Sequence, residues 1–130
     1  MEIRIYYEDT DAGGVVYHAN YLGFFERGRT EFLRRRGLSV KQLHDDGLIF
    51  PVVRVEADFR SPARLDDLLR ITTTVLEVGR SSFTLQQCAI RQEDDRLLVA
   101  AKITLVCVAP GMKARRLPPL LLEALNSSHD

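Results

Sequence analysis

The chain has 130 residues, of which 18 are Lys or Arg and 18 are Asp or Glu, so its formal net charge is zero. This balance argues against nucleic acid or an anionic membrane as the main partner, because both are bound by strongly basic surfaces. The length fits one domain over residues 1–130, and a hydrophobic share of 45% is typical of a chain with a buried core. No apolar run approaches the roughly 18 residues of a transmembrane helix.

The two cysteines, Cys88 and Cys107, each lie inside an apolar stretch. Free buried thiols are typical of proteins in a reducing compartment. The first residues have the pattern of a strand and not that of a signal peptide. The sequence therefore predicts a cytoplasmic protein in which neither cysteine is catalytic.

The chain begins with a pattern typical of a strand. Over residues 2–8, Ile3, Ile5 and Tyr7 alternate with polar residues and are expected to share one face. Residues 9–19 then carry carboxylates, glycines and a histidine, a composition that predicts a loop.

Apolar residues spaced by three and four predict a long helix from residue 18 or 20 to residue 36, which Gly37 stops. Gly23 and Gly28 each cost this helix about 1 kcal/mol relative to alanine. Both are tolerable if a sheet packs closely against that face. Ser39 is a suitable N-cap for a short second helix that ends near residue 46.

Four strands are expected after Gly47, over residues 53–60, 68–78, 82–92 and 97–109. The first alternates apolar and charged residues, which predicts a half-buried strand. The last is apolar on both faces, and one helix covers only one face of a sheet. A second copy of the chain is therefore expected to cover the other, which predicts an oligomer.

Pro118 and Pro119 open a short helix over residues 120–125, and residues 126–130 are expected to fray. Short turns make neighbouring strands antiparallel. The expected fold class is therefore α+β, with one curved antiparallel sheet wrapped around one long central helix.

Several stretches resemble the hot-dog-fold acyl-CoA thioesterases of the 4-hydroxybenzoyl-CoA thioesterase type, in particular the tol-pal system-associated subgroup. The most specific is DTDAGGVVYHANYL, residues 9–22, after Tyr7; GRTEFLRRRG, ADFRSPARLDD and GRSSF add support. The resemblance spans nearly the whole chain. It implies hydrolysis of acyl-CoA thioesters and a homotetramer built as a dimer of dimers, with sites at subunit interfaces.

The resemblance implies that Asp11 is the catalytic carboxylate. It also implies that the backbone N–H of His18 polarises the thioester carbonyl, with the imidazole and Tyr7 as helpers. Physical chemistry agrees, because a carboxylate close to a helix N-terminus stays ionised and can act as nucleophile or base. The plain alternatives are that Asp9 and Asp11 bond their own loop, that His18 caps the helix and that Tyr7 packs in the core.

Coenzyme A carries phosphates, and arginines at strand ends suit them. By resemblance, Arg60 and Ser61 and the turn of Arg80 and Ser82 border this part of the substrate. The alternative is that they are solvated turn residues. Arg115 and Arg116 are weaker candidates.

The sequence predicts no metal site, because no HExxH or paired CxxC accompanies its histidines and carboxylates. No cofactor is expected, since coenzyme A is part of the substrate. A serine or cysteine triad is disfavoured by the absence of G-x-S-x-G. The second function to weigh is a module that binds acyl-CoA or acyl carrier protein with little turnover, in phospholipid metabolism. A hot-dog dehydratase is disfavoured, because the residue pattern of that branch is absent.

Overall fold

The computed structural model describes residues 1–127, so the expectation for residues 128–130 lies outside it. Five strands form one antiparallel sheet in the order β1-β3-β4-β5-β2, and β6 and β7 form a separate small hairpin. The elements are β1 (Glu2–Arg4), a 3-10 turn (Tyr7–Asp9), α1 (Asn20–Arg35), α2 (Val40–Asp45), β2 (Val52–Phe59), β3 (Leu68–Val78), β4 (Ser82–Arg91), β5 (Arg96–Val106), β6 (Val108–Ala109), β7 (Lys113–Ala114) and α3 (Pro119–Asn126).

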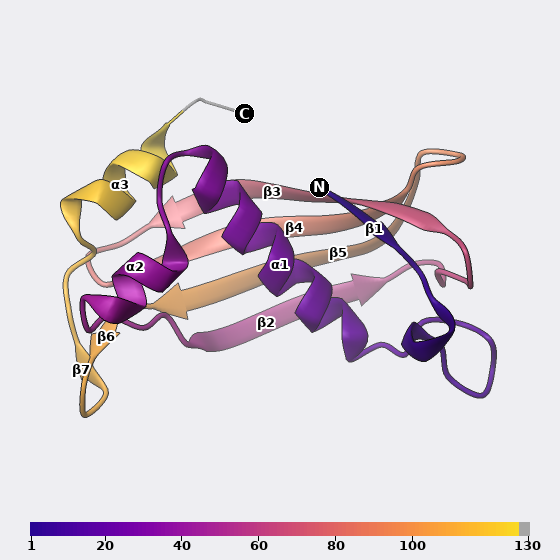
Figure 1. Ribbon diagram of the computed structural model, residues 1–130, viewed down its shortest axis with the longest axis horizontal. Helices are drawn as coiled ribbons and strands as arrows, with labels where there is room; N and C mark the ends of the chain where they lie inside the picture. The colour runs from indigo at the N-terminus through magenta and orange to yellow at the C-terminus, as the bar shows by residue number, and fades with distance from the viewer. Residues whose placement is uncertain (128–130) are drawn as a thin grey trace.

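The helix α1 crosses one face of this sheet (Figure 1). It packs on β3 and β4 and buries one apolar stripe, as its spacing predicts. The buried residues of the stripe are Tyr21, Phe24, Phe25, Gly28, Phe32 and Leu33. One long helix against a curved antiparallel sheet is the hot-dog arrangement, so the expected fold class is confirmed.

The helix boundaries follow the predicted signals. Gly37 has φ +81°, the left-handed conformation that ends a helix, and the Ser39 hydroxyl accepts a hydrogen bond from the backbone N–H of Gln42 at 3.2 Å. The expectation for Gly28 is also confirmed, because the sheet leaves no room for a side chain there. The expectation for Gly23 is wrong, since its α-carbon faces open space.

The first strand is shorter than predicted. It ends at Arg4, and residues 7–9 form a 3-10 turn, although Ile3 and Ile5 are buried as expected. Tyr7 does not share their face and is 81% exposed. The Asp9 carboxylate accepts the Tyr6 N–H at 2.9 Å, which fixes this turn in place of a further strand residue.

The prediction of a half-buried strand over residues 53–60 is wrong, and the cause lies in the order of the strands. β2 and β3 are consecutive in sequence but lie at separate positions in the sheet. The strand β2 is an exposed edge strand, not half-buried, because α1 lies over β3 and β4. Two of its apolar side chains on the helix side of the sheet, Val55 and Phe59, are 39% and 54% exposed.

The strand predicted over residues 97–109 divides into β5 and β6 at Cys107, whose N–H donates to the Ser81 carbonyl. One face of β5 is buried. The other holds half-buried Ala100, Thr104 and Val106 and exposed Lys102. A partner for this second face stays a prediction. No helix within residues 1–127 is long and apolar enough to cross a membrane.

Candidate active site

The loop before α1 is a tight hairpin closed on itself by backbone hydrogen bonds. The Asp11 N–H donates to the Val15 carbonyl at 2.8 Å, and Thr10 and Val16 form an isolated β-bridge. The Asp11 side chain is exposed at the tip, and its Oδ1 accepts the Gly13 N–H at 2.8 Å. This hydrogen bond within the loop is the alternative, purely structural role of Asp11. It occupies one carboxylate oxygen, and Oδ2 has no hydrogen bond within residues 1–127.

Asn20 ties this hairpin to the start of α1. Its side-chain amide donates to the Asp9 carbonyl at 2.9 Å, and the Tyr17 N–H donates to the same oxygen at 3.2 Å. An asparagine at the start of a helix commonly caps it, but Asn20 does not cap α1. The N-cap residue is Ala19, which has no capping side chain. The amide of Asn20 instead holds the carboxylate loop against the helix.

His18 lies in the turn that leads into α1. Its carbonyl accepts the Tyr21 N–H at 3.3 Å, whereas its own N–H has no acceptor among the described residues. The imidazole is exposed and lies against Tyr17, with ring centroids 4.5 Å apart, and at 6.2 Å from the Phe59 ring. A free N–H at a helix start is a suitable donor to a developing oxyanion.

The segment from β2 to β3 crosses the sheet at this end of α1, because these two strands are not neighbours. It carries Arg60 and Ser61, which line a cavity of about 260 Å³ together with His18 and Phe59. The Ala63 N–H donates to the buried Tyr21 hydroxyl at 3.3 Å, and the Ala63 carbonyl accepts the Val16 N–H at 2.9 Å. The crossing segment is thereby held on both the helix and the hairpin.

Burial raises the pKa of Tyr21 above its ordinary value, and the hydrogen bond from Ala63 opposes this in part. The apolar spacing of the helix places Tyr21 in the core, and its hydroxyl is not among the expected site groups. The signal was present, because a buried tyrosine needs a hydrogen-bond partner. The partner's position depends on where the crossing segment runs, which the sequence does not state.

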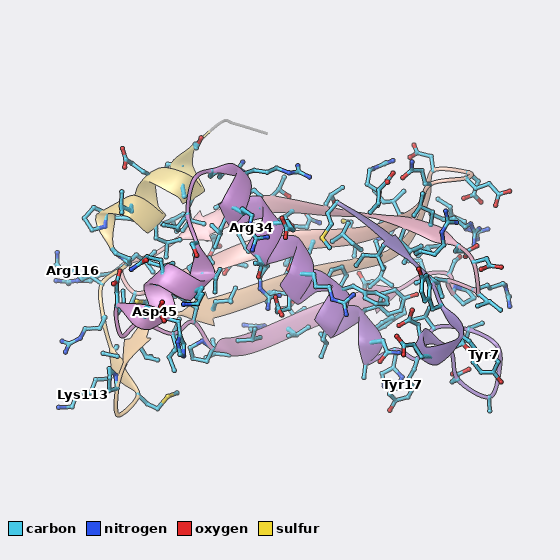
Figure 2. The ribbon with its side chains drawn as sticks, viewed as in Figure 1. Tyr7, Tyr17, Arg34, Asp45, Lys113 and Arg116 are labelled. Atoms are coloured by element: carbon cyan, nitrogen blue, oxygen red, sulfur yellow. The ribbon has the colours of Figure 1, made fainter. Side chains whose placement is uncertain are left out.

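Tyr7 and the Arg80 turn lie apart from this cavity. The Tyr7 side chain projects from the molecule (Figure 2), and its hydroxyl makes no hydrogen bond within the described residues. Arg80 and Ser82 lie at the opposite end of the sheet. Phe59 pairs with Val99 and Ser82 pairs with Val106, seven residues further along β5. At about 3.3 Å per residue, this separates the two groups by roughly 23 Å.

Arg80 does lie beside the segment that carries the weaker candidates. Its carbonyl accepts the Leu117 N–H at 3.0 Å, and the Arg115 N–H donates to the Cys107 carbonyl at 2.9 Å. The structure therefore divides the expected binding residues into two groups, one at each end of the sheet. Within residues 1–127, no three His, Cys, Asp or Glu side chains cluster closely enough to hold a metal ion.

A family model described as thioesterase superfamily matches residues 13–99. The acyl-CoA thioester hydrolase YbgC of Escherichia coli O6:H1 is 44% identical over 117 residues, which cover 89% of this chain and 87% of that protein. These matches confirm the resemblance to acyl-CoA thioesterases.

Solved structures agree in fold. A 1,4-dihydroxy-2-naphthoyl-CoA thioesterase from Synechocystis superposes with a TM-score of 0.91 at 28% identity, over 100% of this chain and 97% of that one. A probable thioesterase from Bartonella henselae gives 0.85 at 41% identity, over 91% and 97%. The chain belongs to the thioesterase superfamily and is a thioester hydrolase.

Proposed function

We propose that this protein hydrolyses acyl-CoA thioesters to a free acid and coenzyme A at the Asp11 hairpin. One observation carries the proposal. The exposed Asp11 carboxylate lies on a hairpin that leads directly to His18, whose N–H has no acceptor in the described chain. The group that acts as nucleophile or base and the donor to the oxyanion thus lie on one segment. The side chain of Asn20 holds this segment in place.

The chemistry needs only these groups and water. Either Asp11 takes a proton from water, whose oxygen attacks the thioester carbonyl, or the carboxylate attacks and forms an anhydride that water then cleaves. In both routes the carbonyl oxygen becomes negative beside the His18 N–H. The C–S bond then breaks, and coenzyme A leaves as a thiolate that takes up a proton. The imidazole of His18, on the same segment, is the proposed donor of this proton.

Arg60 and Ser61 are proposed to bind the phosphates of coenzyme A, because they line the same cavity as His18. Arg80 and Ser82 are too far away to complete this site within one protomer. A second copy resolves the separation. The strand β2 has one unpaired edge, and antiparallel pairing with β2 of a second copy would bring the Arg80 end of one protomer toward the His18 end of the other.

This pairing supports a dimer, and the partly exposed second face of the sheet supports a homotetramer made of two such dimers. A cytoplasmic location is proposed on the two free thiols alone. The role of Tyr7 as a helper requires that the turn before the hairpin, or a second copy, bring its hydroxyl to the substrate.

A second candidate function is binding of acyl carrier protein with little turnover. The basis is the β6–β7 hairpin, where Lys113, Arg115 and Arg116 are all exposed. Figure 2 shows Lys113 and Arg116 directed away from the molecule. Such cations suit an acidic protein partner. Tight binding of the carrier protein, with negligible turnover of every thioester, would favour this function.

The deciding experiment measures thiol release from acyl-CoAs that range from short aliphatic to aromatic. Wild type is compared with Asp11→Asn and Asp9→Asn. We expect Asp11→Asn to lose at least about a hundredfold in kcat. Asp9→Asn should retain clear activity, because its carboxylate holds the Tyr6 N–H of the preceding turn. Near-wild-type turnover by Asp11→Asn would refute the assignment.

A further inference from the structure

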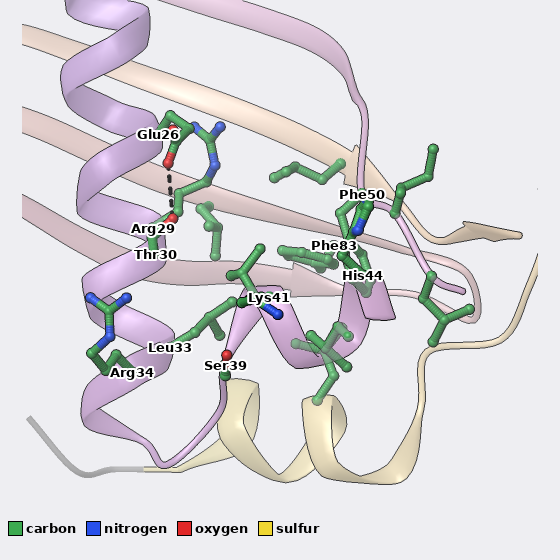
Figure 3. Close-up of a pocket in the computed structure, with 17 residues that line it drawn as sticks. Glu26, Arg29, Thr30, Leu33, Arg34, Ser39, Lys41, His44, Phe50 and Phe83 are labelled. Carbon is green, nitrogen blue, oxygen red and sulfur yellow. Dashed lines mark hydrogen bonds between the residues drawn. The ribbon is translucent and has the colours of Figure 1, made fainter. Parts of the chain in front are cut away.

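A second and larger cavity, of about 590 Å³, lies between α1, α2 and the sheet (Figure 3). None of its lining residues belongs to the Asp11–His18 hairpin. It lies toward the end of the sheet where Phe83 pairs with Leu105, away from the His18 end. Its volume falls in the range of small-molecule sites, roughly 300–1,000 Å³.

The interior of this cavity is a hydrocarbon surface. Its walls are apolar side chains from both helices, the sheet and α3, and Phe50 and Phe83 meet edge to face with ring centroids 6.1 Å apart. They include Leu33, Leu43, Phe50, Phe83, Leu85 and Leu121. The apolar part of this lining selects an aliphatic or aromatic body. The polar side chains of Thr30, Ser39 and His44 also line the cavity.

The rim of the cavity is charged and mainly cationic, with Arg29, Arg34 and Lys41 against Glu26. Two of these cations have carboxylate partners, since Arg34 contacts Glu31 and Lys41 bonds Asp45 at 2.7 Å. Glu26 accepts the Thr30 hydroxyl at 2.9 Å. Arg29 has no salt bridge within residues 1–127, and its guanidinium donates to the neutral Gln87 side chain at 3.2 Å.

The arginine is held in place by a buried amide. Gln87 is fully buried beneath α1, and its Nε2 donates to the Phe25 carbonyl at 2.8 Å and to the Thr73 hydroxyl at 3.0 Å. Both amide protons are thus used inside the fold, which leaves Oε1 to orient Arg29. A guanidinium has five N–H donors, so most of those of Arg29 stay available to an anion.

Burial also costs the Arg29 cation part of its hydration, and this lowers its pKa from the usual arginine value. A carboxylate ligand would relieve this cost, because it brings the opposite charge to a half-buried cation.

We propose that this cavity binds a single-chain aliphatic carboxylate, with the chain among the leucines and phenylalanines and the carboxylate on Arg29. The class is that of the acid which hydrolysis of an aliphatic acyl thioester releases, so the identity of the ligand rests on the proposed function. The site itself rests on the cavity and on the Arg29–Gln87 pair.

The test is calorimetric titration of the protein with sodium decanoate, with sodium butanoate and decan-1-ol as ligands that lack the chain or the charge. We expect decanoate to bind and both others to bind at least about tenfold more weakly. Arg29→Gln should weaken decanoate about tenfold or more, whereas Arg29→Lys retains part of the affinity.

Matched controls come from the same elements. Arg27→Gln removes an exposed cation of α1 that does not line the cavity, and Leu120→Trp enlarges an exposed side chain on α3. Neither should change decanoate binding. Leu33→Phe narrows the interior of the cavity and should weaken decanoate binding. If Leu33→Phe does not fold, Thr30→Trp takes its place, because it narrows the rim of the cavity without changing the core.

Absence of decanoate binding to the wild type, or equal binding by every variant, would overturn the site. Binding that responds to Leu33→Phe or Thr30→Trp but not to Arg29→Gln would overturn the assignment of the carboxylate to Arg29. Thiol release by the wild type is measured separately. Its loss in Asp11→Asn judges the hydrolase proposal, whatever the outcome of the titration.

Discussion

A Cβ atom on Gly28 would lie 2.7 Å from Cγ2 of Ile71 and 3.1 Å from Nε2 of Gln87. The helix α1 and the strand β3 therefore approach each other at a point where only glycine fits. This close contact sets how deeply the helix lies on the sheet. It also sets the position of Gln87, and through it the position of Arg29.

Gly28→Ala is expected to destabilise the protein by about 1–3 kcal/mol, because the added methyl overpacks a buried contact. The gain in helix propensity, about 1 kcal/mol, offsets this only in part. Gly23→Ala lies in the same helix over open space and should stabilise by about 0.5–1 kcal/mol. Urea unfolding of both variants gives the comparison, and a Gly28→Ala variant as stable as Gly23→Ala would contradict the close packing.

Asn20→Ala is expected to lower kcat about tenfold or more, because the carboxylate hairpin loses its bond to the helix. Asn20→Asp is the sharper variant. An aspartate in the first turn favours the helix, yet it cannot donate to the Asp9 carbonyl. Its stability should therefore stay close to wild type while kcat falls as in Asn20→Ala. Unchanged turnover in both variants would show that the hairpin needs no such support.

Tyr21→Phe removes a buried hydroxyl that accepts the Ala63 N–H, and should lower the free energy of unfolding by about 1–2 kcal/mol.

Tyr21 also makes the stability of the fold depend on pH. Its pKa is raised in the folded state, so its contribution is complete below the unfolded-state pKa of about 10 and declines as the pH rises toward the folded-state pKa. Unfolding followed between pH 8 and 11 should show a steeper loss for wild type than for Tyr21→Phe. Equal slopes would contradict this assignment.

Arg60→Ala is expected to raise KM for acyl-CoA about tenfold, because one contact to a phosphate is lost. KM for the matching acyl-pantetheine, which lacks the nucleotide phosphates, should stay unchanged. Arg54→Ala, on the preceding strand β2 and paired with Glu56, is the control. An equal rise in KM for both thioesters would mean that Arg60 contacts the acyl group or stabilises the fold, and does not bind the phosphates.

The sequence by itself determined the elements whose signals are local. The apolar spacing from Tyr21 to Leu33, the Ser39 cap and the left-handed Gly37 fixed the helices, because these depend on neighbours in the chain. The motif from Asp9 to Leu22 also identified the family, and with it the fold. The resemblance of this motif pointed to Asp11 and His18, and one contiguous segment carries both.

Only the tertiary structure decided how distant segments meet. The place of β2 at the edge of the sheet, next to β5, is set by long-range pairing, and it makes the chain cross to β3 over the end of α1. This crossing brings Arg60 and Ser61 to His18 and leaves Arg80 at the other end of the sheet. The hydrogen bond between Arg29 and Gln87 joins residues 58 positions apart. The spacing of residues in either segment does not predict this bond. Strand alternation gives the face of a residue, whereas its neighbours across the layers follow from packing alone.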